Sequence, residues 1–219
     1  MNKKYKSSGL IKEEEIANSI SHGVGIIIAI AVVTILVVFG AIYGTVWHVV
    51  SFSVFGASMI TLYIASTLFH GATKLRLKYK LNIFDHSSIY LLIAGTYTPI
   101  ALVALHHNWI GWSLFGLIWV LAIVGIIYKI WFYQSKWTKL STLLYVIMGW
   151  LIVIAIVPII KNVPNISLWF LLAGALSYNA GVFFFVYHKI PFFHFIFHLF
   201  ILGGSICHFF AFLYLIPFP

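Results

Sequence analysis

The chain has 219 residues, of which 63% are apolar and only 8% carry a charge. A soluble domain has about 25% charged residues because its surface must face water. The composition therefore excludes a soluble globular protein and indicates a chain whose solvent is lipid. The single cysteine, Cys207, also excludes an intramolecular disulfide framework and a cysteine-cluster metal site.

Long apolar runs make up most of the chain, and a helix needs about 20 such residues to cross a membrane. The runs are continuously apolar, which argues against the alternating strands of a membrane β-barrel. Residues 1–22 are expected to form a cytoplasmic N-terminal segment. The polar breaks that follow predict seven spans, over residues 23–43, 47–69, 84–105, 110–132, 140–160, 166–187 and 191–216. We therefore expect one all-α transmembrane domain of seven helices over residues 1–219.

The basic residues indicate how this bundle crosses the membrane. With the N-terminus inside, the outer segments hold only Lys161, and twelve of the 13 basic residues lie on inner segments: Lys3, Lys4, Lys6, Lys12, Lys74, Arg76, Lys78, Lys80, Lys129, Lys136, Lys139 and Lys189. Cytoplasmic loops carry such an excess of Lys and Arg, so the C-terminus is predicted outside. The net charge of +9 then reflects topology and attraction to anionic lipid. Membrane lipids are the expected partners, and neither nucleic acid nor a protein partner is indicated.

Four ionisable residues are predicted to lie just beneath the inner face of the membrane. His70 ends the second span, Asp85 opens the third, and His194 and His198 open the seventh. At about 1.5 Å per residue from the nearest inner lysine, their depths are roughly 6 Å for His70, roughly 7–8 Å for Asp85 and His194, and about 13 Å for His198. Three helices that are distant in sequence thus place imidazoles and a carboxylate in one layer. Ionisable groups inside a span are costly and mark functional sites.

The residue types in this layer are those of a metal site. His194 and His198 are four residues apart, so their side chains share one helix face. With His70 they would form a three-histidine set that leaves a fourth tetrahedral position for water. Imidazoles suit Zn²⁺, although copper, nickel and iron also accept them. Asp85 could act as the general base, and Ser66, on the same face as His70, could donate a hydrogen bond to an oxyanion or to the water.

Simpler roles are open to each of these residues. An interfacial histidine can bond a lipid headgroup or a carbonyl, and an aspartate near the end of a span can cap the helix and pair with a lysine such as Lys80. The agreement of depth and residue type favours the metal site over these readings.

Glu15, Asn18 and His22 form a second polar stripe, because spacings of three and four place them on one helix face. They lie at the level of the expected metal site and could support its ligands from outside. They could equally be a polar helix start with interfacial anchors. The remaining histidines, including His208, are expected to be structural.

The combined pattern resembles the hemolysin-III-like branch of the progestin and adipoQ receptor family over essentially the whole chain. The matching pieces are Glu15-x2-Asn18-x3-His22, Ser66-x3-His70-Gly71, Asp85 leading into Ser87-Ser88-Ile89-Tyr90 and Ala94-Gly95-Thr96-Tyr97-Thr98-Pro99, and His194-x3-His198. The resemblance implies zinc bound by His70, His194 and His198, with Asp85 and Ser66 close to the metal-bound water. It also implies kinship with alkaline ceramidases and a multi-pass protein of a bacterial plasma membrane.

Three functions are compatible with these observations. The first is a zinc-dependent hydrolase that cleaves a lipid amide or ester at the cytoplasmic leaflet. The second is a pore-forming cytolysin, which the family name implies, although a pore former normally has a soluble state that this composition does not favour. The third is a non-catalytic protein of membrane homeostasis, in which zinc is a structural link between the second and seventh spans.

Overall fold

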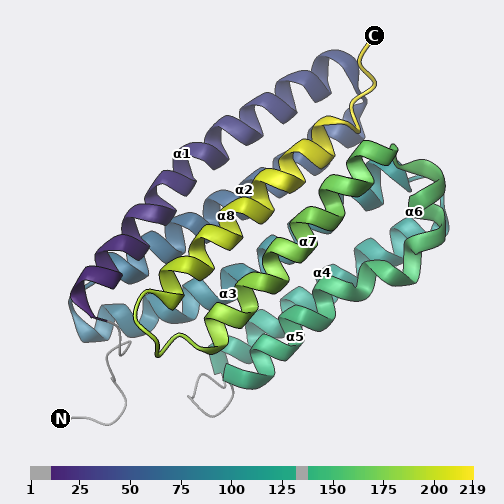
Figure 1. Ribbon diagram of the computed structural model, residues 1–219. Coiled ribbons are helices and arrows are strands. Elements are labelled where there is room, and N and C mark those ends of the chain that lie inside the picture. The colour runs from purple at the N-terminus through teal and green to yellow at the C-terminus, as the bar shows by residue number, and fades with distance from the viewer. Residues whose placement is uncertain (1–10, 132–137) are drawn as a thin grey trace.

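The protein, described from a computed structural model over residues 11–131 and 138–219, is an all-helical bundle (Figure 1). Of the basic residues counted for orientation, Lys3, Lys4, Lys6 and Lys136 lie outside these ranges. The helices are α1 (Lys12–Tyr43), α2 (Val46–Gly71), α3 (Leu75–Pro99), α4 (Trp109–Trp131), α5 (Thr138–Trp150), α6 (Ile156–Asn162), α7 (Asn165–Val186) and α8 (Phe193–Leu213). A π-helical turn over Ile100–Ala104 extends α3, and a 3-10 turn over Leu151–Ala155 joins α5 to α6.

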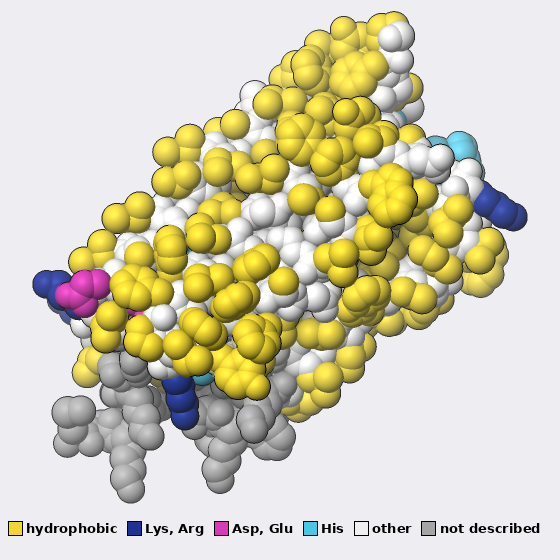
Figure 2. All heavy atoms as spheres, in the orientation of Figure 1, with side chains coloured by type: hydrophobic (Ala, Val, Ile, Leu, Met, Phe, Trp, Pro, Cys, Tyr) yellow, Lys and Arg dark blue, Asp and Glu magenta, His cyan; other side chains and the backbone are white. Residues whose placement is uncertain are grey.

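The helices run along one common axis, and their sides are apolar. Within the described ranges, seven helical stretches are long and apolar enough to cross a membrane, which confirms the expected architecture. Figure 2 shows hydrophobic side chains over the sides of the bundle and most charged side chains near its two ends. Large aliphatic side chains such as Ile27 and Ile154 are each 70% exposed. Such an apolar exterior is suited to lipid and not to water.

The order of packing determines which helices can share a site. Helix α1 packs against α2 and α8, α2 packs against α3, and α7 packs against α8. The first and last helices of the chain are therefore neighbours (Figure 1). One end of the bundle accordingly collects the start of α1, the end of α2 and the starts of α3 and α8.

Two helices begin earlier than the apolar runs suggested. Helix α1 begins at Lys12, where a start near residue 23 was expected, and α3 begins at Leu75, where residue 84 was expected. The residues between Lys74 and Asp85 include neither Gly nor Pro, and Leu, Lys and Arg all favour helix. In α1, three glutamates stand in the first turn, where the positive end of the helix dipole stabilises carboxylates. A helix can thus continue beyond the hydrocarbon layer.

The fifth span is not one continuous helix. It passes from α5 through the 3-10 turn into α6, and Tyr97 of α3 supports the break. The Tyr97 hydroxyl lies 2.7 Å from the carbonyl oxygen of Met148 and accepts a hydrogen bond from the Ile152 N–H at 2.8 Å. Irregular backbone is tolerated inside a membrane only where protein groups or a water-filled cavity satisfy it. Tyr97 therefore allows the helix to change geometry beside the cavity described below.

The orientation of the bundle remains a prediction of the basic residues. In a Cys207→Ser background, we expect a cysteine at Thr73, between α2 and α3, to react with a membrane-impermeant thiol reagent only from the cytoplasmic side. A cysteine at Phe218 should react only from outside, because an odd number of spans separates the two positions. Labelling of intact cells and of inverted vesicles measures this. Outer labelling at Thr73 would contradict the predicted orientation.

Candidate metal centre

Three buried histidines meet at the end of the bundle where α2 finishes and α8 begins. His70, His194 and His198 are 4%, 8% and 1% exposed, and each offers one ligand atom within 4.8 Å of the others. The ring centroids of His194 and His198 are 4.8 Å apart, and each lies 5.0 Å from the centroid of His70. The structure thus brings together the three histidines that the sequence suggested as a ligand set. The group could hold one metal ion.

Hydrogen bonds orient two of these rings toward a shared centre. His70 Nδ1 lies 2.7 Å from Glu15 Oε2, and a carboxylate accepts, so Nδ1 carries the proton. His198 Nδ1 lies 3.1 Å from the Ser21 hydroxyl, which already donates its proton to the Asn18 carbonyl at 2.8 Å. His198 must then donate from Nδ1 as well. Both rings therefore keep the lone pair on Nε2, as a metal ligand requires.

The Nε2 atom of His70 shows why these residues fit a metal ion. It is buried and has no hydrogen-bond partner among the described residues. Buried polar atoms are nearly always paired, so an unpaired nitrogen beside two further imidazoles is suited to be a metal ligand. A carboxylate behind a metal-binding histidine is also the usual outer support of such sites.

Helix α1 contacts all three histidines. Glu14, only 1% exposed, accepts a hydrogen bond from the His194 backbone N–H at 3.2 Å, so its carboxylate lies at the N-terminus of α8. The ring of His22 stacks on that of His198 with centroids 3.6 Å apart and an angle of 8°. Glu15 and Asn18 approach His70 Nδ1, Asn18 through its amide nitrogen at 3.5 Å. The polar stripe at the start of α1 is therefore buried against the metal centre.

Several supporting residues were not found from the sequence. Glu14 and Ser21 belong to the same side of α1 as the predicted stripe and could have been found by extending it. Lys78, assigned to a basic loop, lies in the first turns of α3 and pairs with Glu15 at 2.9 Å. Its ammonium also lies 5.0 Å from the centre of the Phe69 ring. Glu15 thus connects a lysine of α3 with a histidine of α2.

Asp85 lies well inside α3, because the helix begins ten residues earlier at Leu75. The alternative that Asp85 caps this helix is therefore wrong. Its carboxylate interacts electrostatically with His70 and with Lys129 of α4, a lysine that is only 5% exposed. Lys129 was counted from the sequence among the basic residues of the inner segments, and nothing in its local pattern showed that it is buried. Lys129 supplies the buried countercharge that had been sought in Lys80.

Ser66 and Asp85 line the same cavity as His194 and His198. Ser66 is only 1% exposed, and its hydroxyl faces Asp85. The hydroxyl does not reach hydrogen-bond geometry with any described residue. His86 Nδ1 lies 3.7 Å from Asp85 Oδ2 and 2.9 Å from the Asn82 carbonyl. A hydroxyl without a protein partner and a carboxylate therefore stand beside the three imidazoles.

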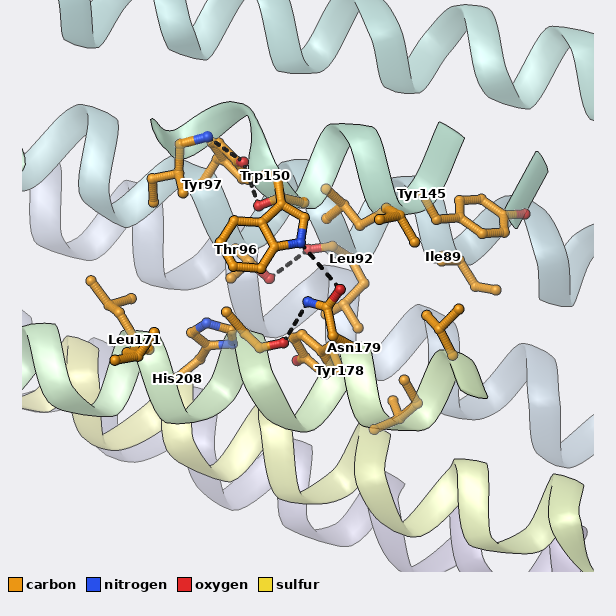
Figure 3. Close-up of a pocket in the computed structure, with 18 of the residues that line it drawn as sticks. Ile89, Leu92, Thr96, Tyr97, Tyr145, Trp150, Leu171, Tyr178, Asn179 and His208 are labelled. Atoms are coloured by element: carbon orange, nitrogen blue, oxygen red, sulfur yellow. Dashed lines mark hydrogen bonds between the residues drawn. The ribbon is translucent and has the colours of Figure 1, made fainter. Parts of the chain in front are cut away.

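A cavity of about 700 Å³ extends from this polar end along the bundle. Its walls are contributed mainly by α3, α5, α6, α7 and α8, with a smaller part from α1 and α2. Beyond the histidines most of the lining side chains are apolar, among them Ile93, Ile159 and Leu171. Figure 3 shows part of this lining, with Leu92 and Ile89 on one side and Leu171 on another. The volume lies in the range of small-molecule sites. The shape and lining suit a hydrocarbon chain whose polar end lies at the histidines.

The other histidines play two different roles. His48 Nδ1 accepts a hydrogen bond from the Thr45 N–H at 3.0 Å, and its Nε2 lies 3.2 Å from the Leu215 carbonyl oxygen. This agrees with the structural role expected for it. His208, for which a structural role was also expected, lines the cavity.

Comparison with known proteins identifies the family. The family model described as Haemolysin-III related matches residues 10–209. The chain is 48% identical over 206 residues to Hemolysin-3 of Bacillus cereus, an alignment that covers 94% of this chain and 93% of the relative. It is 44% identical over 202 residues to the Hemolysin-3 homolog of Bacillus subtilis (strain 168), covering 92% and 94%. The human monocyte to macrophage differentiation factor is 29% identical over 177 residues, covering 75% and 70%. The chain therefore belongs to the hemolysin-III family, and with seven membrane-length apolar stretches within the described ranges it is a multi-pass membrane protein.

Proposed function

We propose that this protein is a zinc-dependent hydrolase that cleaves lipid amides or esters at the cytoplasmic leaflet. The observation that carries the proposal is a three-imidazole group with a carboxylate and an unpartnered hydroxyl at the polar end of a long apolar cavity. Zinc suits three imidazoles and, when bound, makes water acidic enough to attack near neutral pH and polarises a carbonyl. Water and a carbonyl are the two reactants of such a hydrolysis.

The side chains around this centre have separate roles in the proposed reaction. Asp85 lines the cavity beside the imidazoles and accepts the proton of the attacking water, as a general base must. Ser66, whose hydroxyl has no partner within the described protein, donates a hydrogen bond to the oxyanion that develops on the carbonyl. Lys129 balances the charge on Asp85. The apolar cavity holds the acyl chain and keeps bulk water away from the reacting carbonyl.

A non-catalytic role is supported by a different observation. Glu14, Glu15 and Ser21 connect α1 to the ligands on α2 and α8, so a bound ion would join three helices. In that case zinc would act as a structural link and the protein would influence the membrane without turnover.

Lysis is a third candidate because the relative from Bacillus cereus is named Hemolysin-3. The mainly apolar lining of the cavity favours an acyl chain over ions and water. If the protein lyses membranes, dye release from vesicles should be the same for the wild type and for His70→Ala.

The hydrolase proposal is tested by comparing lipids in membranes that hold equal amounts of wild-type protein, His70→Ala, and the control His107→Ala. His107 is exposed at the turn before α4, away from the metal centre. We expect free fatty acid to accumulate with the wild type and with His107→Ala, and to stay at background with His70→Ala. Identical lipids in all three membranes, with zinc retained by the purified wild type, would instead favour the structural link.

A further inference from the structure

A second polar position lies along the cavity, at His208 of α8. His208 is ten residues beyond His198, which places it about 15 Å further along the helix. Its side chain lines the same cavity as the metal centre, and the residue is only 5% exposed (Figure 3). Its Nδ1 has no hydrogen-bond partner among the described residues. The sequence had suggested a structural histidine, and the structure adds that its ring lines the cavity.

The ring of His208 is held by packing. It lies over Gly174 of α7, where a Cβ atom would come within 2.9 Å of His208 Nε2. The ring centroid lies 5.2 Å from that of Tyr178 and 5.9 Å from that of Phe212, whose plane is within 15° of the imidazole plane. These contacts fix the orientation of the imidazole and satisfy none of its hydrogen-bonding capacity at Nδ1.

Neighbouring polar side chains are already paired with one another. The Tyr63 hydroxyl donates to Ser205 Oγ at 2.7 Å, and the Tyr178 hydroxyl lies 3.0 Å from the same oxygen.

Other polar side chains of the cavity wall are paired as well. Thr96 donates to the Leu92 carbonyl. The Asn179 amide donates to the Ala175 carbonyl and accepts from the Trp150 indole N–H (Figure 3). His208 therefore stands apart from the other polar groups shown in this part of the cavity. A buried polar atom without a partner is costly, and the ring that carries this one lines the cavity.

We propose that His208 binds a hydroxyl group carried part-way along the acyl chain of the lipid in the cavity. The inference rests on the proposed function in one respect, namely that the cavity accepts an acyl chain with its head at the metal centre. A hydroxyl can both donate and accept, so it pairs with an imidazole nitrogen in either tautomer. The separation of about 15 Å between His198 and His208 sets where along the chain the hydroxyl must lie. The protein would thus select mid-chain hydroxylated lipids over plain ones.

The test uses the purified, zinc-loaded protein in nanodiscs and measures binding of stearate and of hydroxystearates whose hydroxyl is moved along the chain. For the wild type we expect a mid-chain hydroxyl to tighten binding by several-fold to about tenfold, the contribution of one hydrogen bond. His208→Leu should lose this preference and bind stearate as before. His208→Gln, which keeps a hydrogen-bonding group, should retain part of it. The matched control Thr96→Val, which removes another hydroxyl from the cavity wall, should keep the preference.

The outcomes separate the two proposals. If stearate binds but hydroxylation gives no advantage at any position, or if the advantage survives in both His208 variants, the His208 inference is overturned and the acyl cavity stands. If no fatty acid binds the wild type, the acyl cavity itself is wrong and the inference falls with it. Zinc content and thermal stability of each variant show whether a lost preference for the hydroxyl reflects misfolding. If His208→Leu is misfolded, His208→Gln tests the inference.

Discussion

Replacing His198 with alanine should remove most of the zinc from the purified protein. His198 is the most buried of the three candidate ligands, and Ser21 orients its ring. Even loss of an outer supporting residue weakens metal sites about 10–100-fold, so loss of a ligand should lower affinity by more than about 100-fold. Two imidazoles and water hold the ion far less well than three imidazoles. Elemental analysis after dialysis against a weak chelator measures the effect.

His208→Leu is the matched control, because it removes an equally buried imidazole from the same helix. Its zinc content should stay near that of the wild type, since His208 lies about 15 Å from His198 along α8. His194→Ala should behave as His198→Ala does. A protein that keeps its zinc without His198 and loses it without His208 would show that the ligand set is assigned to the wrong residues.

Asp85→Asn should abolish lipid turnover and leave zinc and fold in place. The amide keeps the shape of the side chain but cannot accept a proton, and a positioned general base typically contributes about 10²–10⁴-fold. The carboxylate lies inside α3, only 13% exposed at its side chain, and interacts electrostatically with His70 and Lys129. Such a residue is costly to keep in a membrane without a function. Product formation, zinc content and thermal stability are all measured on the one variant.

The control for this variant is Glu13→Gln, which neutralises an exposed acid on α1 outside the centre. It should leave all three measurements unchanged. If Asp85→Asn lowers stability or zinc affinity while lipid turnover continues, Asp85 is a structural residue. Full turnover with normal zinc would remove Asp85 from the mechanism.

The membrane itself makes the number of spans predictable from the sequence. Every span needs about 20 apolar residues, so the apolar runs give the number of spans directly. They do not give the helix ends, because charged turns such as those between Lys74 and Asp85 are helical outside the apolar region. The break between α5 and α6 has a local signal in Pro158, whose ring clashes with the carbonyl four residues earlier, at Ile154. Its support does not, because the Tyr97 hydroxyl that accepts from the Ile152 N–H comes from another helix.

The metal centre was predictable where depth and residue type agree. His70, His194, His198 and Asp85 could be placed in one layer by counting from the inner lysines. The structure groups the three histidines, and Asp85, His194 and His198 line one cavity. Residues whose role depends on a partner on another helix could not be found by counting along the sequence. Lys129 reads as one of many inner lysines until the rotation of α4 is known.

His208 is another residue whose position along its helix could be predicted and whose surroundings could not. Its distance from His198 is predictable from the helical rise, but the cavity that its ring lines is a property of packing among several helices. An isolated histidine in an apolar helix carries no signal for such a role.

X-ray absorption at the zinc edge of the purified wild-type protein tests the metal assignment most directly. The account predicts one zinc per chain with three nitrogen ligands at about 2.0–2.1 Å and one oxygen ligand. The same measurement on His70→Ala should show zinc lost or a nitrogen ligand replaced by oxygen. A protein without bound zinc, or a zinc with a sulfur ligand, would contradict the centre formed by His70, His194 and His198.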